Sequence, residues 1–192
     1  MKLAFLTPGT GNYYCGVCMR DNSLARCLID AGHEVTMLPT YLPHFLDEEP
    51  AADELPIFFG GINVYLQHKF PLFRHTPAWM DKALDSKWLL KKAAAKSGMT
   101  SSKDLGEITL STFRGEDGPL VKEVRKVVDW FHAHGKPDVI LLSTIMLAGI
   151  GKVLRRELNI PVFGFLQGED SFLDSLLPEY RNQAWKLLRS DV

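Results

Sequence analysis

Two short segments of the chain combine residue types that could bind an anion or a sugar. Residues 8–18 form a glycine-rich loop ahead of a predicted helix, where free backbone N–H groups and the positive end of the helix dipole favour a negative charge. Residues 167–170, Gln-Gly-Glu-Asp, place two adjacent carboxylates after a predicted buried strand. These could accept hydrogen bonds from sugar hydroxyls, or one could act as a base. Asp170 could equally cap a helix, because the apolar pair Phe172-Leu173 follows it closely.

The glycine-rich loop does not fit two common nucleotide-binding motifs. A dinucleotide fingerprint requires a third glycine at the position of Tyr14 and an acidic residue where Pro39-Thr40 stand. A Walker A loop requires Lys and then Ser or Thr at the positions of Val17 and Cys18. Nicotinamide binding is therefore disfavoured and ATP hydrolysis of the P-loop type is excluded. Two interpretations of the loop remain: it binds another anion, or it is a tight turn without a ligand.

Arg20 and Asp21 follow the loop, at the start of the predicted helix. Arg20 could contact a phosphate held by the loop, or it could be a solvated charge. An acidic residue in the first helical turn interacts favourably with the dipole, so helix capping is the simplest interpretation of Asp21.

Cys15 and Cys18 form a CxxC motif at the same junction. Thioredoxins place their CxxC where a strand leads into a helix, because a helix N-terminus favours the reactive thiolate. The length of the chain and its parallel-sheet pattern argue against a thioredoxin, and a zinc site needs about four ligands. Cys27 falls on the apolar stripe of the predicted helix. The alternatives are a redox role and two small side chains that pack the loop.

His132 and His134 could suggest a metal ion, but they lie at a predicted helix end beside Gly135. Cationic side chains interact favourably with the dipole there. We therefore predict no metal site, and no cofactor.

Apolar runs and helical periodicity predict the elements that position these residues. Buried strands are predicted at 3–6, 33–39, 139–142 and 162–166. The first helix is predicted from an apolar face at Met19, Leu24, Cys27, Leu28 and Ala31, with Gly32 as a left-handed C-terminal cap. A second helix spans 120–134, with Val121, Val124, Val127, Val128 and Phe131 on its buried stripe, and a third spans about 144–158.

This order of strands and helices predicts an α/β fold: a Rossmann-like open, mostly parallel sheet with helices on both faces and a helical insertion in the middle. The middle of the chain, about 41–118, is interrupted by prolines. It holds a predicted strand at 62–66 and a helical elaboration over about 70–118. Ligands of such sheets bind at the carboxyl ends of the strands near a topological switch point, where both loops are expected.

Composition excludes several classes of protein. The chain has 22 basic and 23 acidic residues, so no overall field attracts it to nucleic acid. Its three cysteines are too few for a disulfide-stapled secreted scaffold. No apolar run approaches the roughly 18 residues of a membrane span, and the N-terminal run is too short for a signal peptide. We expect a cytoplasmic location. The basic amphipathic stretch 82–96 could contact an anionic membrane surface, or could be a solvated helix face.

Several motifs together resemble the N-terminal half of family 4 glycosyltransferases, which have the GT-B fold. The resemblance covers residues 1–40 and 135–170 best. It rests on Asn-Ser-Leu-Ala-Arg-Cys-Leu at 22–28, Ala-Gly-His-Glu-Val-Thr at 31–36, Lys-Pro-Asp-Val-Ile at 136–140 and Ile-Pro-Val at 160–162.

The resemblance implies a retaining transferase that moves a sugar from a nucleotide-sugar co-substrate to an unidentified sugar or lipid-linked acceptor, without a metal. Residues 1–192 would form a single Rossmann-like, acceptor-side domain. Because family members are about twice as long, the C-terminal donor domain would be absent from this chain, and the chain alone would be inactive. The implied substrate- and donor-binding residues are Gly11, Asn12, Gly16, Arg20, Gln167, Gly168, Glu169 and Asp170.

The chain departs from the family at two positions. Cys15 stands where the first glycine of a pair is usual, and Gln167 stands where a histidine often contacts the donor sugar. The catalytic residues are therefore not identified from the sequence. The alternatives are a thiol oxidoreductase that uses Cys15 and Cys18, and a non-catalytic α/β binding module.

Overall fold

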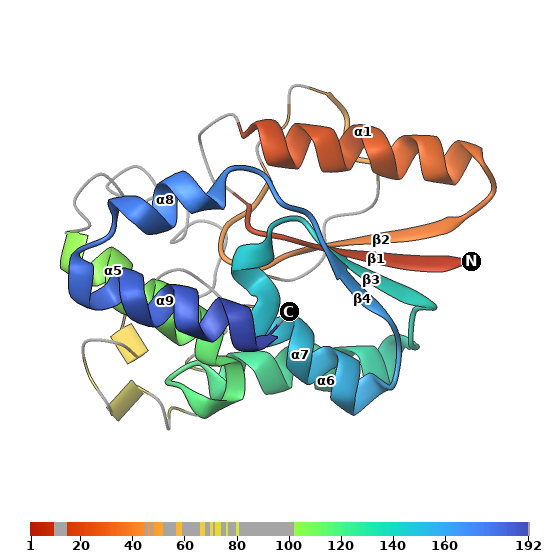
Figure 1. The fold of residues 1–192 in the computed structure, drawn as a ribbon. Coiled ribbons are helices and arrows are strands. Elements are labelled where there is room, and N and C mark those ends of the chain that lie inside the picture. The colour runs from red at the N-terminus through yellow and green to blue at the C-terminus, as the bar shows by residue number, and fades with distance from the viewer. Residues whose placement is uncertain are drawn as a thin grey trace.

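A computed structural model describes residues 1–9, 15–44, 46, 48–51, 57–58, 66–67, 70, 72–73, 76, 80 and 102–191. Its centre is a four-stranded parallel sheet in the order β2-β1-β3-β4 (Figure 1). The strands are β1 (Lys2–Thr7), β2 (Glu34–Pro39), β3 (Val139–Leu142) and β4 (Val162–Gly164). The chain therefore has the predicted Rossmann-like open α/β fold.

The register of the sheet follows from the apolar runs. Leu3 of β1 lies opposite Val35 of β2 on one side and Val139 of β3 on the other. Five consecutive residues of β1, from Leu3 to Thr7, are buried. This pattern is typical of an inner parallel strand that is covered on both faces.

Helix α1 (Gly16–Asp30) covers one face of the sheet. Gly32 follows it with φ of 85°, which confirms the predicted left-handed cap. The prediction for the buried face was partly wrong, because Cys27 and Ala31 are exposed and the other three residues are only half-buried. The residues that α1 buries are Cys18, Asp21, Asn22 and Ala25.

Helices α6 (Val121–His134) and α7 (Ala148–Leu158) cover the other face. Val124, Val127, Val128 and Phe131 are buried there as predicted. Val121 is 42% exposed, so the prediction that it belongs to the buried stripe was wrong.

The remaining helical segments gather beyond the carboxyl ends of the strands (Figure 1). They are α5 (Ser102–Arg114), η3 (Gly115–Asp117), η4 (Ile145–Leu147), α8 (Glu169–Ser175) and α9 (Pro178–Asp191). Leu110, Phe113, Ala148, Leu173 and Leu188 form a second core between them. A Cβ atom on Gly149 would lie 2.1 Å from the Phe113 carbonyl oxygen, so α5 and α7 meet backbone to backbone.

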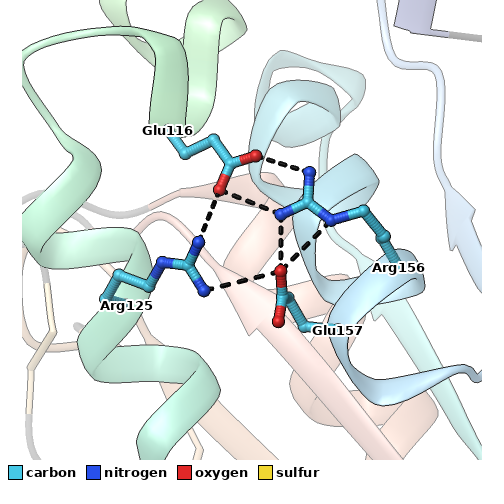
Figure 2. A network of polar contacts seen from close by, with 4 residues as sticks. All are labelled: Glu116, Arg125, Arg156 and Glu157. Atoms are coloured by element: carbon cyan, nitrogen blue, oxygen red, sulfur yellow. Dashed lines mark hydrogen bonds and ion pairs between the residues drawn. The ribbon is translucent and has the colours of Figure 1, made fainter.

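An ion-pair network joins η3, α6 and α7 on the surface (Figure 2). Glu116 accepts from Arg125 at 2.9 Å and from Arg156 at 2.5 Å. Glu157 forms ion pairs with the same two arginines, at 3.4 Å with Arg125 and 2.5 Å with Arg156. Each arginine thus bridges both carboxylates, which fixes the three elements against one another.

Several predictions for the middle of the chain cannot be compared with the structure. Residues 62–65 of the predicted strand lie outside the described residues, and Leu66 lies in a helical turn instead. The basic stretch 82–96 also lies outside them. The described part of the predicted helical elaboration contains α5 and η3.

The edge strand β4 is shorter than predicted and poorly covered. It spans three residues, Phe163 is 60% exposed and Leu166, beyond its end, is 78% exposed. Within the described residues, no helix is both long enough and apolar enough to cross a membrane.

Candidate functional site

The candidate site lies where β1 and β3 end side by side. From β1 the chain crosses through α1 to β2, whereas β3 lies on the other side of β1. The strand order therefore reverses between β1 and β3, which is the topological switch point at which open α/β sheets bind ligands. The Ser143 N–H, directly after β3, donates to the Leu6 carbonyl oxygen at 2.9 Å.

A buried carboxylate, Asp21, lies at the centre of the site. The Ser143 hydroxyl donates to its Oδ2 atom. The Arg20 guanidinium donates to its Oδ1 atom through Nε at 2.9 Å and Nη2 at 2.5 Å. The interpretation of Asp21 as a first-turn residue was wrong, because α1 begins at Gly16 and Asp21 belongs to its second turn.

The Arg20 side chain contacts Asp21, Ser143 and Phe165 and is 34% exposed. Besides its bonds to Asp21, Nη2 donates to the Ser143 carbonyl oxygen at 3.2 Å. The guanidinium carbon lies 4.2 Å from the centroid of the Phe165 ring, a cation–π contact. These contacts orient the guanidinium.

Gln167 reaches the same carbonyl group from the other predicted loop. Its Nε2 atom donates to the Ser143 carbonyl oxygen at 2.5 Å. Two predicted site residues, Arg20 and Gln167, therefore meet at one backbone atom. We refer to Arg20, Asp21, Ser143, Phe165 and Gln167 as the switch-point cluster.

The turn after β4 is held by Glu169. Its carboxylate accepts a hydrogen bond from the Thr144 hydroxyl at 2.6 Å and another from the Gln167 N–H at 2.5 Å. Gly168, with φ of 91°, is the N-cap of α8, which excludes the alternative in which Asp170 caps this helix. Asp170 lies in the first turn and is exposed. Glu169 positions Gln167, whereas Asp170 is accessible to a ligand.

The glycine-rich loop is described only at its ends. Gly11 and Asn12 lie outside the described residues. Gly16 is exposed, and within the described part of the chain nothing lies within 4 Å of the position that a Cβ atom would take. Cys15 is the N-cap of α1, but its side chain makes no capping hydrogen bond.

Sequence reasoning missed Ser143 and Phe165 as members of the site. A signal for Ser143 was available, because it follows a fully apolar strand at the edge where ligands bind. No such signal existed for Phe165, whose apolar side chain is suited equally to a strand interior.

The CxxC thiols are neighbours at the start of α1. Cys18 is buried and Cys15 is half-buried, and both are free thiols. Burial is the main cause that raises the pKa of the Cys18 thiol to about 12, and the charge of Cys15 and its hydrogen bond to Cys18 raise it further. The exposed Cys27 is also a free thiol.

Two open hollows lie elsewhere on the surface. One, of about 530 Å³, is lined by Trp185 and Asp174, whose side chains share a 2.9 Å hydrogen bond. The other, of about 610 Å³, is lined by Lys152 and Arg155 of α7. Within the described part of the chain, no group of three or more His, Cys, Asp and Glu residues is arranged to hold a metal ion.

Comparison with known proteins returns no matching family model, no matching curated protein and no matching solved structure.

Proposed function

We propose that this chain is the acceptor-side half of a retaining glycosyltransferase and that its switch-point cluster contacts the diphosphate of a nucleotide-sugar. The convergence of Arg20 and Gln167 on the Ser143 carbonyl oxygen carries the proposal. Arg20 follows the first of the two loops that the sequence singled out, and Gln167 belongs to the second. They meet where open α/β sheets bind ligands.

The geometry of Arg20 suits a phosphate ligand. Asp21 and Ser143 occupy its Nε and Nη2 atoms, and its Nη1 atom donates to no residue that the structure describes. A guanidinium fixed in this way needs little reorganisation when charge develops on a leaving diphosphate. Gly16, at the N-terminus of α1, would add a backbone N–H donor.

The second loop would contact hydroxyl groups of the sugar or the acceptor. Asp170 is an exposed acceptor, and Gln167 is held beside Arg20. Glu169 would act indirectly, by holding the turn through Thr144. We place this chemistry in the cytoplasm, and contact of residues 82–96 with an anionic membrane surface is part of the proposal.

Binding of UDP and GDP by the purified chain, followed by amide NMR, tests the proposal. Signals of residues 16–20, 143–144 and 167–170 are expected to shift. Arg20→Gln should weaken binding at least about tenfold, because a charge-assisted hydrogen bond contributes about 1.5–3 kcal/mol. Arg26→Gln, an exposed arginine of the same helix, is the matched control. Equal losses in the two variants, or shifts elsewhere only, would contradict the proposal.

Transfer of the sugar by these residues alone is not expected. In the proposal, these residues form the acceptor side of the cleft, and a separate donor domain binds the nucleotide. Turnover of a nucleotide-sugar by the purified 192-residue chain would contradict this division.

A thiol oxidoreductase is the second candidate, because the free thiols of Cys15 and Cys18 lie at the N-terminus of α1, where a thiolate is favoured. Reduction of insulin disulfides by the chain, abolished by Cys15→Ser, would favour it. A non-catalytic binding module would bind a sugar or nucleotide without turnover, even when a donor domain is supplied.

A further inference from the structure

Cys15 and Cys18 lie at the two ends of the first turn of α1. Cys15 is the N-cap residue, with extended φ and ψ angles of −127° and 114°, and Cys18 is the third helical residue. Residues three positions apart at the start of a helix are neighbours on its surface, so the two side chains lie close together. Cys15 is near enough to raise the pKa of the Cys18 thiol. A disulfide bond requires such an approach, because its geometry tolerates little displacement of the backbone.

The two thiols differ sharply in access. Cys15 is half-buried, and the space around the neighbouring Gly16 is open. Cys18 is fully buried. The first thiol is therefore the more accessible of the two to a small molecule. This asymmetry distinguishes the pair from two cysteines that only fill a core.

We propose that Cys15 and Cys18 are a reversible modification site, at which an intramolecular disulfide forms by exchange with a low-molecular-weight disulfide such as glutathione disulfide. Cys15 is the attacking thiol and Cys18 the resolving thiol. The inference is independent of the proposed transferase, because it uses neither Arg20 nor Gln167.

The reaction proceeds in two exchanges. The Cys15 thiolate attacks one sulfur of glutathione disulfide, a bond to that sulfur forms, and the first glutathione thiolate leaves. Cys18 then loses its proton, which the departing glutathione accepts, and attacks Cys15 Sγ to expel the second glutathione. The two protein thiols are oxidised to one disulfide, and one glutathione disulfide is reduced to two thiols.

The surroundings of Cys18 favour this order of events. Its raised pKa keeps it protonated while Cys15 is free. Once Cys15 carries glutathione, Cys15 can no longer ionise. One cause of the raised pKa of Cys18 is then removed. The second exchange is intramolecular between adjacent sulfurs, so it is expected to outrun attack by a second external thiol.

The test uses the Cys27→Ser chain, which removes the exposed third thiol. It is equilibrated in glutathione buffers of increasing oxidation, quenched with acid, alkylated and measured by intact mass. The expected result is the joint loss of both alkylation sites without a glutathione adduct, reversed by dithiothreitol. A persistent adduct on Cys15 beside a free Cys18, or no oxidation in the most oxidising buffer, would overturn the proposal.

Two variants assign the roles of the thiols. In Cys18→Ala with Cys27→Ser, glutathione should accumulate on Cys15. In Cys15→Ser, Cys18 should be alkylated at least about tenfold more slowly than Cys27, because it is buried. Serine is a favoured N-cap residue, so this second variant is expected to fold even if Cys18→Ala does not. Equal alkylation rates at Cys18 and Cys27 in a folded Cys15→Ser chain would overturn the assignment.

Discussion

The guanidinium group of Arg20 lies over the Phe165 ring, with its carbon 4.2 Å from the ring centroid. Arg20 belongs to the second turn of α1, and Phe165 directly follows the edge strand β4. The contact therefore crosses the switch point of the sheet. Together with the bonds to Asp21, it fixes both the plane and the direction of the guanidinium in the absence of a ligand.

Asp21→Asn should lower the free energy of unfolding by about 1–3 kcal/mol, because the buried carboxylate accepts hydrogen bonds from Ser143 and Arg20. Urea denaturation measures the effect. Asp170→Asn, an exposed carboxylate at the same edge, is the control and should change stability by less than about 0.5 kcal/mol. Equal effects of the two substitutions would show that Asp21 does not organise the cluster.

Gly149→Ala should destabilise the chain by about 1–3 kcal/mol, because the new methyl group would clash with a backbone carbonyl group that cannot turn away. Thermal and urea unfolding both measure this loss. Gly16→Ala is the matched control, since nothing lies within 4 Å of its Cβ position. A Gly149→Ala chain as stable as the control would be incompatible with the close approach of α5 and α7.

The network of Figure 2 should make stability dependent on pH in acid. Hydrogen bonds from Arg156 hold the pKa values of Glu116 and Glu157 below the ordinary value of 4.5. The folded chain therefore binds these protons less readily than the unfolded chain. The stabilisation is present above pH 4.5 and is lost as the pH falls through the lowered values.

Arg156→Gln should accordingly flatten the fall in unfolding free energy below pH 4.5. Arg155→Gln, an exposed neighbour in the same helix, should keep the wild-type slope. Urea denaturation over a pH series measures both slopes. A wild-type slope in Arg156→Gln would contradict the role given to the network.

Tyr41 should make stability dependent on pH in alkali. Burial raises its pKa from 10.0 to about 12, against the opposing effect of its hydrogen bond to Thr112. The unfolded chain then releases the phenol proton first, so stability is complete below pH 10 and falls as the pH rises toward 12. Tyr41→Phe should lose this dependence, and absorbance titration should find one tyrosine that ionises late. Normal ionisation of every tyrosine in the folded chain would contradict the prediction.

The fold was predictable because its signals are local. The apolar runs of β1 and β3 and the left-handed Gly32 needed no knowledge of distant residues. The face that α1 buries was not predictable in the same way. Its buried positions include Asp21 and Asn22, whose partners Ser143, Glu49 and Ala51 lie far along the chain.

The candidate site was predictable only in part. The carboxyl-end rule brought Arg20 and Gln167 to the same edge, and their meeting there is confirmed. Which carbonyl they share depends on the register of β3 against β1, which hydrophobic patterning does not determine. Helix α8 begins at Glu169, two residues earlier than an N-cap at Asp170 would place it. Gly168 is the N-cap instead and adopts the left-handed conformation that ends the loop.

The backbone contact between Gly149 and Phe113 has a mechanical consequence. No side chain lies between the two segments to absorb a displacement, so the start of α7 and the end of α5 must shift as one piece. Thr144 and Ser143 stand only a few residues before Gly149, and the core of Leu110 and Phe113 extends to α8 and α9. A displacement of the end of β3 would therefore also displace the helices that lie beyond the sheet.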